Sequence, residues 1–304
     1  MIHQKKQHWF AMLFVWKGSV LPQLLPRLLL LLVFSVAVVY VRGTFGAYKI
    51  PLNPAPFTLF GLALALFLGF RNSASYDRFW EGRKLWGALL NDTRSLARQA
   101  TTLCRYETGA KQQALFIRYL VAFTYALKHQ LRHTDARADL ERLLPADTAR
   151  RMMAAQYKPI MLLKEMGLWI DQAKAERRTD SILQSAMETN LNKLSDIVGG
   201  CERLANTLIP YTYKVLLHRT VYVYCFLLPF AFVDSLGWMT PIVVVFIAYT
   251  FTAWEAIADE IEEPFGTEPN DLALDGMCKM IENTLLELNG EPLANKLSQE
   301  YIQL

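Results

Sequence analysis

Four long stretches without charged side chains constrain this chain more than any other feature of its sequence. They cover residues 28–41, 54–70, 220–233 and 235–254. A helix needs about 20 apolar residues to cross a bilayer, so the fourth stretch is a full span and the first and third are short. However, the stretches form two close pairs joined by short loops, and aromatic residues lie near their ends, as in interfacial belts. We therefore expect an all-α membrane protein with about four transmembrane helices.

The first stretch gains length if the residues before it are included. Leu21, Leu24 and Leu25 continue its apolar character upstream, and only Arg27 intervenes. A long arginine side chain near a helix end can extend to the membrane interface. The first transmembrane helix can therefore begin well before residue 28.

The chain also contains too much charge for a membrane bundle alone. Hydrophobic residues make up 53% of the 304 residues, yet charged residues make up 20%. The charge is concentrated outside the four stretches, which divides the chain into four segments. They are a segment with the first helix pair (1–70), a helical region (71–219), the second helix pair (220–258) and a C-terminal segment (259–304).

The region between the two pairs has the pattern of amphipathic helices. Apolar residues recur there at three- and four-residue steps among charged and polar ones, which predicts helix. The expected helices cover residues 75–105, 111–133, 139–153, 158–174 and 181–208. Thr108-Gly109 is expected to end one helix and Pro145 to start a new turn. Gly199-Gly200 indicates close backbone packing or a bend.

The distribution of basic residues predicts how the chain is oriented in the membrane. Lys and Arg are frequent before the first stretch and directly after the second, whereas the link between the third and fourth stretches contains neither. By the positive-inside rule, both termini and the 71–219 region are cytosolic.

The second apolar stretch need not end at the membrane. Between Phe57 and Arg98 there is no proline, and glycines occur only singly. The first half of this segment is apolar on all sides and the second half is amphipathic. Either one long helix continues from the bilayer into the cytosol, or a membrane helix is followed by a separate cytosolic helix.

Several classes of function have no support in the sequence. The four cysteines are scattered and form neither a zinc ligand set nor a disulfide framework. His129 and His133 would share a helical face, but no third ligand accompanies them, and a solvated face is the simpler interpretation. There is no phosphate-binding loop, no nucleophile elbow and no dense basic run. We expect no enzyme, no cofactor, no metal site and no binding of nucleic acid.

An acidic group directly follows the fourth stretch. Its members are Asp259, Glu260, Glu262, Glu263, Glu268 and Asp271. Oxygen-rich loops of this kind can bind calcium, or attract cations to the mouth of a pore. Alternatively, these carboxylates form salt bridges with the basic residues after the second stretch. The spacing does not match an EF-hand.

Three motifs resemble those of bacterial bestrophin homologues. They are FRNSASYDRFWEGRKLWG at 70–87, GGCERLANT at 199–207 and EEPFGTEPND at 262–271. The resemblance covers nearly the whole chain, with the motifs in the same order and with the same membrane layout. It implies a homopentameric channel in the bacterial inner membrane, with one central pore lined by the second membrane helix.

The resemblance also implies where the pore is narrow. In the membrane, the neck corresponds to Leu62, Leu66 and Phe70, which share one helical face at i, i+4 and i+8. Apolar rings of this kind can gate a pore by dewetting. Residues 62 and 66 are Leu where many members carry Ile. From composition alone the stripe equally fits ordinary packing.

A second constriction of the family lies in the cytosolic vestibule, where Ile182 is the matching residue. A core isoleucine is the alternative interpretation of Ile182. Animal members bind calcium after the fourth span, and Glu268 and Asp271 match acidic positions of that site. Glu263 replaces an asparagine there, and Pro269-Asn270 interrupts the aspartate run, so we do not expect calcium gating.

The expected function is a pentameric ion channel that passes small inorganic ions, with anions such as chloride favoured because animal bestrophins pass them. A monovalent cation channel of the same fold is one alternative, since no basic ring is apparent in the neck. A membrane-anchored scaffold that binds a cytosolic protein is the other. The sequence names no such partner.

Overall fold

The structure is a computed structural model that describes residues 9–12, 14–16, 18–45, 48–49, 52–106 and 111–293. Its described residues are nearly all helical, and the chain separates into two compact units. The unit that we call the apolar unit contains the described residues of Lys5–Arg78 and Leu208–Glu263. In the other, the polar unit, the described residues come from Phe79–Thr207 and Pro264–Leu304.

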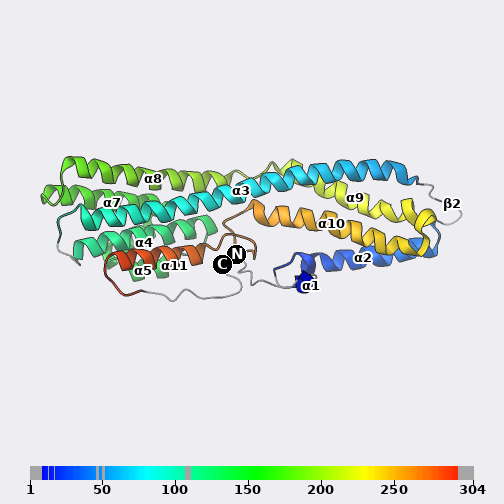
Figure 1. Ribbon diagram of the computed structural model, residues 1–304, viewed down its shortest axis with the longest axis horizontal. Helices are drawn as coiled ribbons and strands as arrows, with labels where there is room; N and C mark the ends of the chain where they lie inside the picture. The colour runs from blue at the N-terminus through cyan, green and yellow to red at the C-terminus, as the bar shows by residue number, and fades with distance from the viewer. Residues whose placement is uncertain are drawn as a thin grey trace. The chain divides into compact units, whose positions relative to one another are not determined.

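The apolar unit is a helical bundle (Figure 1). It is built from α1 (Trp9–Met12), α2 (Leu21–Tyr40), the first part of α3 (Pro54–Thr102), α9 (Tyr211–Leu236), the 3-10 helix η1 (Gly237–Met239) and α10 (Thr240–Glu262). Helix α10 packs against α2 and α9, and α2 also contacts α9. Between α2 and α3, the two-residue strands β1 (Thr44–Phe45) and β2 (Tyr48–Lys49) pair antiparallel. Among the residues that the structure describes, this short hairpin is the exception to the expected all-α fold.

The described residues contain three stretches of helix that are long and apolar enough to cross a membrane. They are Leu21–Tyr40, Pro54–Thr102 and Tyr211–Glu262, of which the third contains α9 and α10. Helix α2 begins at Leu21, so the upstream leucines do lengthen the first apolar stretch. The boundary between the third and fourth stretches was placed too early, because α9 continues to Leu236. It ends there because Gly237 adopts a φ of +52°, which favours glycine.

Helix α3 is continuous from Pro54 to Thr102 and spans 49 residues. Of the two alternatives for this segment, one long helix is therefore correct. Its first part belongs to the apolar unit and its second part, from Phe79, to the polar unit. The expected break at Thr108-Gly109 lies outside the described residues.

The polar unit is organised around α4 (Lys111–Arg132). The other elements are the second part of α3, α5 (Arg137–Leu143), α6 (Ala146–Ala154), α7 (Lys158–Ala175), α8 (Ser181–Asn206) and α11 (Leu274–Leu288). Helix α4 contacts α5, α7, α8 and α11, and every residue from Phe116 to Lys128 is buried except Arg118. A helix that is buried on nearly all sides forms the centre of its domain.

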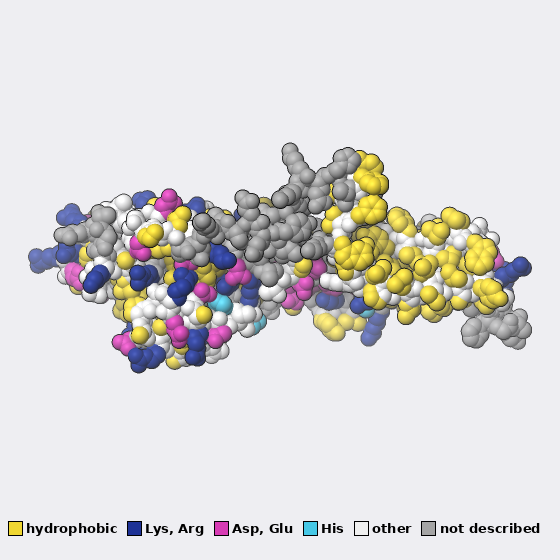
Figure 2. Space-filling view, turned by 90° about the horizontal axis from the view of Figure 1, so that it is seen from below, with side chains coloured by type: hydrophobic (Ala, Val, Ile, Leu, Met, Phe, Trp, Pro, Cys, Tyr) yellow, Lys and Arg dark blue, Asp and Glu magenta, His cyan; other side chains and the backbone are white. Residues whose placement is uncertain are grey.

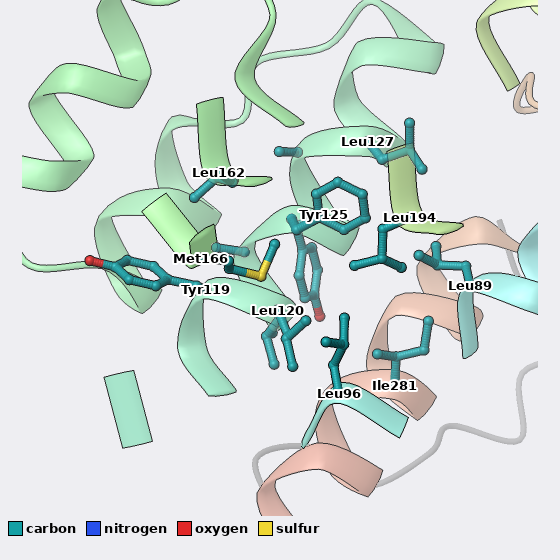
Figure 3. Packing of buried hydrophobic residues seen from close by; sticks show 14 of the residues in the cluster. Leu89, Leu96, Tyr119, Leu120, Tyr125, Leu127, Leu162, Met166, Leu194 and Ile281 are labelled. Carbon is teal, nitrogen blue, oxygen red and sulfur yellow. The ribbon is translucent and has the colours of Figure 1, made fainter. Parts of the chain in front are cut away.

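The core of the polar unit consists of interlocking aliphatic and aromatic side chains. Figure 3 shows Leu120 and Tyr125 of α4 among Leu96 of α3, Met166 of α7 and Ile281 of α11. The expected helix at 139–153 is divided into α5 and α6, and the second of these begins just after Pro145, as predicted. The expected helix at 75–105 is the second part of α3, and the expected helices at 111–133, 158–174 and 181–208 match α4, α7 and α8 closely.

The Gly199-Gly200 pair lies inside α8 without interrupting it. A Cβ atom on Gly200 would lie 2.8 Å from Cδ2 of Leu85, whereas a Cβ on Gly199 would have no neighbour within 4 Å. Close packing against α3 therefore explains Gly200, and the alternative of a bend is not needed.

The four cysteines are free and buried. The histidine pair differs from the expected solvated face at one of its two positions. Nε2 of His129 lies 2.9 Å from Asp139 Oδ2, and its Nδ1 lies 2.6 Å from Thr134 Oγ1. Of the pair, only His133 is exposed. His129 therefore fixes the connection between α4 and α5.

Candidate pore-lining site

The part of α3 in the apolar unit has one buried face. Leu64, Leu68, Arg71 and Ser75 are between 0 and 4% exposed. Their spacing of four, three and four residues places them on one side of the helix. These side chains attach α3 to the rest of the unit.

Leu62, Leu66 and Phe70 lie on the opposite side of α3. Each residue turns a helix by about 100°, so Leu66 is separated by about 200° from both Leu64 and Leu68. The side chains of Leu62, Leu66 and Phe70 are 62%, 58% and 70% exposed. Three large apolar side chains at successive turns therefore face away from the other helices of their own chain.

A close approach between α3 and α9 fixes this orientation. The hydroxyl of Tyr224 donates a hydrogen bond of 3.2 Å to the carbonyl oxygen of Phe57. A Cβ atom on Gly61 would lie 2.5 Å from the same hydroxyl. Glycine at position 61 thus leaves the space that Tyr224 occupies. Farther along, the side-chain amide of Asn72 donates to the carbonyl oxygen of Trp254 on α10 at 3.2 Å.

A buried ion network lies one residue beyond the apolar stripe. Arg71, whose side chain is 2% exposed, contacts Asp259 and Glu262 of α10 through Nη2. Asp259 also pairs with Lys214 Nζ at 2.8 Å, and Glu262 accepts the backbone N–H of Ile209 at 3.2 Å. The network joins α3 to the ends of α9 and α10, so it holds the end of the stripe in place.

The six acidic residues after the fourth stretch are divided between the two units. Asp259 and Glu262 belong to the ion network, while Glu260 is half-buried. In the polar unit, Glu268 is exposed and Asp271 is buried, with Oδ2 accepting the Glu268 backbone N–H at 2.8 Å. That hydrogen bond closes the loop on itself.

Glu263 is exposed at the end of α10. The described part of the chain contains no group of three or more His, Cys, Asp or Glu residues that could hold a metal ion. Salt bridging, the alternative proposed for the acidic group, accounts for Asp259 and Glu262. Hydrogen bonding within the loop accounts for Asp271.

Ile182 occupies the first turn of α8 in the polar unit. Asp180 caps this helix, because its Oδ1 accepts the backbone N–H groups of Ile182 and Leu183, both at 2.9 Å. The Ile182 side chain is 81% exposed. The alternative that it is a core residue is therefore wrong, because its side chain does not pack in the interior of the polar unit.

Sequence reasoning missed Gly61 and Tyr224, and it offered Arg71 only as one of several basic residues with which the acidic group could form salt bridges. Arg71 carried a usable signal, since it lies three residues after Leu68 and seven after Leu64 and so continues one face of the helix. Its acidic partners lie about 190 residues later. No local pattern identifies such a pair.

Comparisons with known proteins agree with this architecture. The family described as Bacterial/Fungal Bestrophin protein matches residues 1–287. A voltage-dependent anion channel-forming protein of Ralstonia nicotianae is 50% identical over 96% of this chain and 95% of its own. The Escherichia coli protein YneE, named in the same way, is 40% identical over 96% of this chain and 95% of its own.

Solved structures support the same assignment. The crystal structure of a bacterial bestrophin homologue from Klebsiella pneumoniae is 44% identical to this chain. The match has a TM-score of 0.84 and covers 88% of this chain and 99% of the other. With a family match over nearly the full length and close relatives in sequence and structure, this chain belongs to the bacterial and fungal bestrophin family of ion channels, which are integral membrane proteins.

Proposed function

We propose that this chain forms a homopentameric channel in which α3 lines a central pore. Leu62, Leu66 and Phe70 of each copy would then form three stacked apolar rings. The observation that carries this proposal is their exposure of 58 to 70% on the side of α3 opposite its buried face. In water, three exposed apolar turns on a single chain would be costly, but in a channel they are the surface that controls wetting.

We propose that the ions are small anions such as chloride. The relatives from Ralstonia nicotianae and Escherichia coli are named voltage-dependent anion channel-forming proteins. The ion network is consistent with this choice, because Arg71 and Lys214 offset the charges of Asp259 and Glu262. Those two carboxylates therefore contribute little to a mouth that attracts cations.

Ile182 would form a second constriction in the cytosolic part of the pathway. Its exposed side chain on the first turn of α8 supports this role, since the interior of the polar unit makes no use of it. A ring of branched aliphatic side chains is a second barrier to hydrated ions. On this proposal both termini and the 71–219 region are cytosolic, and the membrane is the bacterial inner membrane.

The test uses the purified full chain in a planar bilayer under a KCl gradient. A reversal potential close to the chloride equilibrium potential supports the anion channel. A reversal potential close to that of potassium contradicts it and favours the cation channel. If a folded oligomer passes no current, the channel proposal fails and the membrane-anchored scaffold becomes the better interpretation.

A matched pair of substitutions tests the neck. Leu66→Ala widens the proposed ring and should raise single-channel conductance several-fold, because a wider apolar constriction stays wet for longer. Leu30→Ala makes the same change on α2, where Leu30 is 72% exposed, and should leave conductance unchanged. Equal effects of the two substitutions would contradict a pore lined by α3.

A further inference from the structure

Asp77 continues the exposed face of α3 beyond the apolar stripe. It lies seven residues after Phe70, and seven residues make nearly two full turns of a helix, with a rise of about 10 Å. The side chain of Asp77 is exposed, as are those of Ser73 and Ala74 between it and Phe70. Arg71, the charged residue within this interval, lies on the buried face. Asp77 is therefore the first charged residue on the exposed face after the stripe.

The carboxylate of Asp77 is not neutralised by its basic neighbours. Among the described residues it accepts no hydrogen bond and forms no ion pair. Arg78 is adjacent in sequence, but it is half-buried and its Nε donates to the carbonyl oxygen of Glu262 at 2.9 Å. Arg71 forms ion pairs with Asp259 and Glu262. Asp77 thus differs from those two acids, whose charges are offset within their own chain.

An apolar neck is indifferent to the sign of an ion, so the charges at its ends decide which sign passes more easily. We propose that Asp77 is a selectivity-determining residue of the pore, with its carboxylate at the cytosolic end of the neck. In a pentamer, five such carboxylates form a ring that raises the local concentration of small monovalent cations and lowers that of anions. Asp77 therefore limits the anion preference proposed above, and its charge sets how far the reversal potential lies from the chloride equilibrium potential. This inference rests on the proposed function, because it requires the exposed face of α3 to line the pore.

The expected effect follows from Coulomb's law with screening by salt. For five charges taken at one Debye length from the pore axis, which is about 8 Å at physiological salt, each ion's local concentration changes about fivefold. The change is an increase for cations and a decrease for anions. At about 1 M salt the Debye length falls to about 3 Å, and the effect becomes less than about twofold.

Three substitutions at Asp77 separate charge from shape. Asp77→Asn removes the charge at nearly constant volume, Asp77→Lys reverses it, and Asp77→Glu retains it. We expect Asp77→Asn to shift the reversal potential in a KCl gradient toward the chloride equilibrium potential, and Asp77→Lys to shift it further. Asp77→Glu should behave as the unmodified protein. Both shifts should shrink when the mean salt concentration is raised from about 0.15 M to about 1 M.

Glu141→Gln is the matched control. Glu141 is exposed on α5, and its replacement removes the same charge per chain away from α3. It should leave the reversal potential unchanged. Because Asp77 is exposed and makes no contact that folding would lose, the variants should remain oligomeric by size-exclusion chromatography, and each current is recorded from such material.

Two outcomes distinguish the failure of this inference from the failure of the proposed function. If Leu66→Ala alters conductance but Asp77→Lys leaves the reversal potential unchanged, the pore stands and the role of Asp77 is wrong. If neither substitution changes the current, α3 does not line the pathway, and both proposals are wrong. A shift that persists undiminished at high salt would also overturn the electrostatic role of Asp77.

Discussion

The two units of this chain use apolar side chains in opposite ways. In the polar unit, Trp86, Phe116 and Phe123 are fully buried. In the apolar unit, large residues such as Phe246 and Leu30 are 69% and 72% exposed. Figure 2 shows the same contrast, with charged side chains gathered over one part of the surface and hydrophobic side chains over the other.

The contrast teaches how exposure must be interpreted in a protein that meets two solvents. On the proposed topology, water surrounds the polar unit, and burying an apolar side chain there stabilises the fold. Lipid tails are as apolar as leucine, and helix packing in a bilayer depends on close contacts and polar interactions instead. Exposed apolar residues on the apolar unit are therefore compatible with a stable fold, and on the proposed function they face lipid or the pore.

The largest expected effect compares the same substitution in the two units. Phe123→Ala empties a fully buried site of the polar unit, and such truncations cost about 3–5 kcal/mol of unfolding free energy. Phe70→Ala removes a side chain that is 70% exposed, and exposed positions change stability by about 0.5 kcal/mol or less. Thermal unfolding of the full chain in detergent measures both.

The comparison of Phe123 and Phe70 has a second readout. Phe70→Ala should change the current through the channel, whereas Phe123→Ala should act through the amount of folded protein. Equal losses of stability in the two variants would show that Phe70 is packed in the oligomer instead of lining a pore.

The second effect concerns polar contacts, on which the apolar unit depends. Arg71→Leu leaves Glu262 buried without its cationic partner, and breaking a buried ion pair costs about 3–5 kcal/mol. Adding Glu262→Gln removes the uncompensated charge and should recover part of this loss. Thermal unfolding of the single and double variants in detergent checks the prediction. A double variant no more stable than Arg71→Leu would contradict the coupling of these two residues.

The third effect is an opposite change in stability when each of two adjacent glycines of the polar unit is replaced by alanine. Gly200→Ala forces a Cβ to within 2.8 Å of Leu85 Cδ2, and overpacking of this kind costs about 1–3 kcal/mol. Gly199→Ala meets open space, and should stabilise the helix by about 0.5–1 kcal/mol. Adding Leu85→Ala to Gly200→Ala should restore much of the lost stability. If both glycine variants were equally stable, Gly200 would not be a packing residue.

The sequence alone predicted most of the helices and the family, but it did not predict which face of α3 is buried. The absence of proline between Phe57 and Arg98 predicted a long helix as one alternative, and the apolar stretches located the membrane segments. Leu64 and Leu68 are as apolar as Leu62 and Leu66, so composition cannot say which pair is buried. That choice depends on Tyr224 and the space at Gly61, which are far apart in the sequence.

Contacts between segments that are distant in the sequence also decide which acidic residues form ion pairs. Asp259, Glu262 and Asp77 are all acidic residues near basic ones, yet the structure pairs two of them and leaves the third exposed. Ion pairs between distant segments require the fold, because local spacing carries no record of them. The sequence could therefore propose an acidic mouth or salt bridges, and only the structure shows which carboxylates are paired.

The smallest expected effect is a fall in the thermal stability of the polar unit at acid pH. Asp275 accepts from Lys128 Nζ at 2.8 Å and pairs with Arg132 Nη1 at 2.7 Å. Burial alone would raise the pKa of Asp275, but the hydrogen bonds and charges of Lys128 and Arg132 outweigh it and lower the pKa below the usual value of 3.8.

A carboxylate whose pKa is lower in the folded state than in the unfolded state binds protons more weakly when folded. The contribution of Asp275 to stability is therefore present above pH 3.8, its unfolded value, and is lost as the pH falls through the folded pKa. We expect the melting temperature of the unmodified chain to fall in this acid range. Asp275→Asn should melt lower at neutral pH and show a weaker dependence on acid.

Asp147→Asn provides the control, because the Asp147 side chain is 88% exposed and its pair with Arg150 lies on the surface, where such pairs contribute about 0–1 kcal/mol. It should keep both the melting temperature and the acid profile of the unmodified chain. If Asp275→Asn kept the full acid dependence, the ion pairs of α4 and α11 would not be its source. The acid sensitivity of the polar unit would then have to arise at another carboxylate, for which Asp139 beside Lys128 and His129, also with a lowered pKa, is the next to replace.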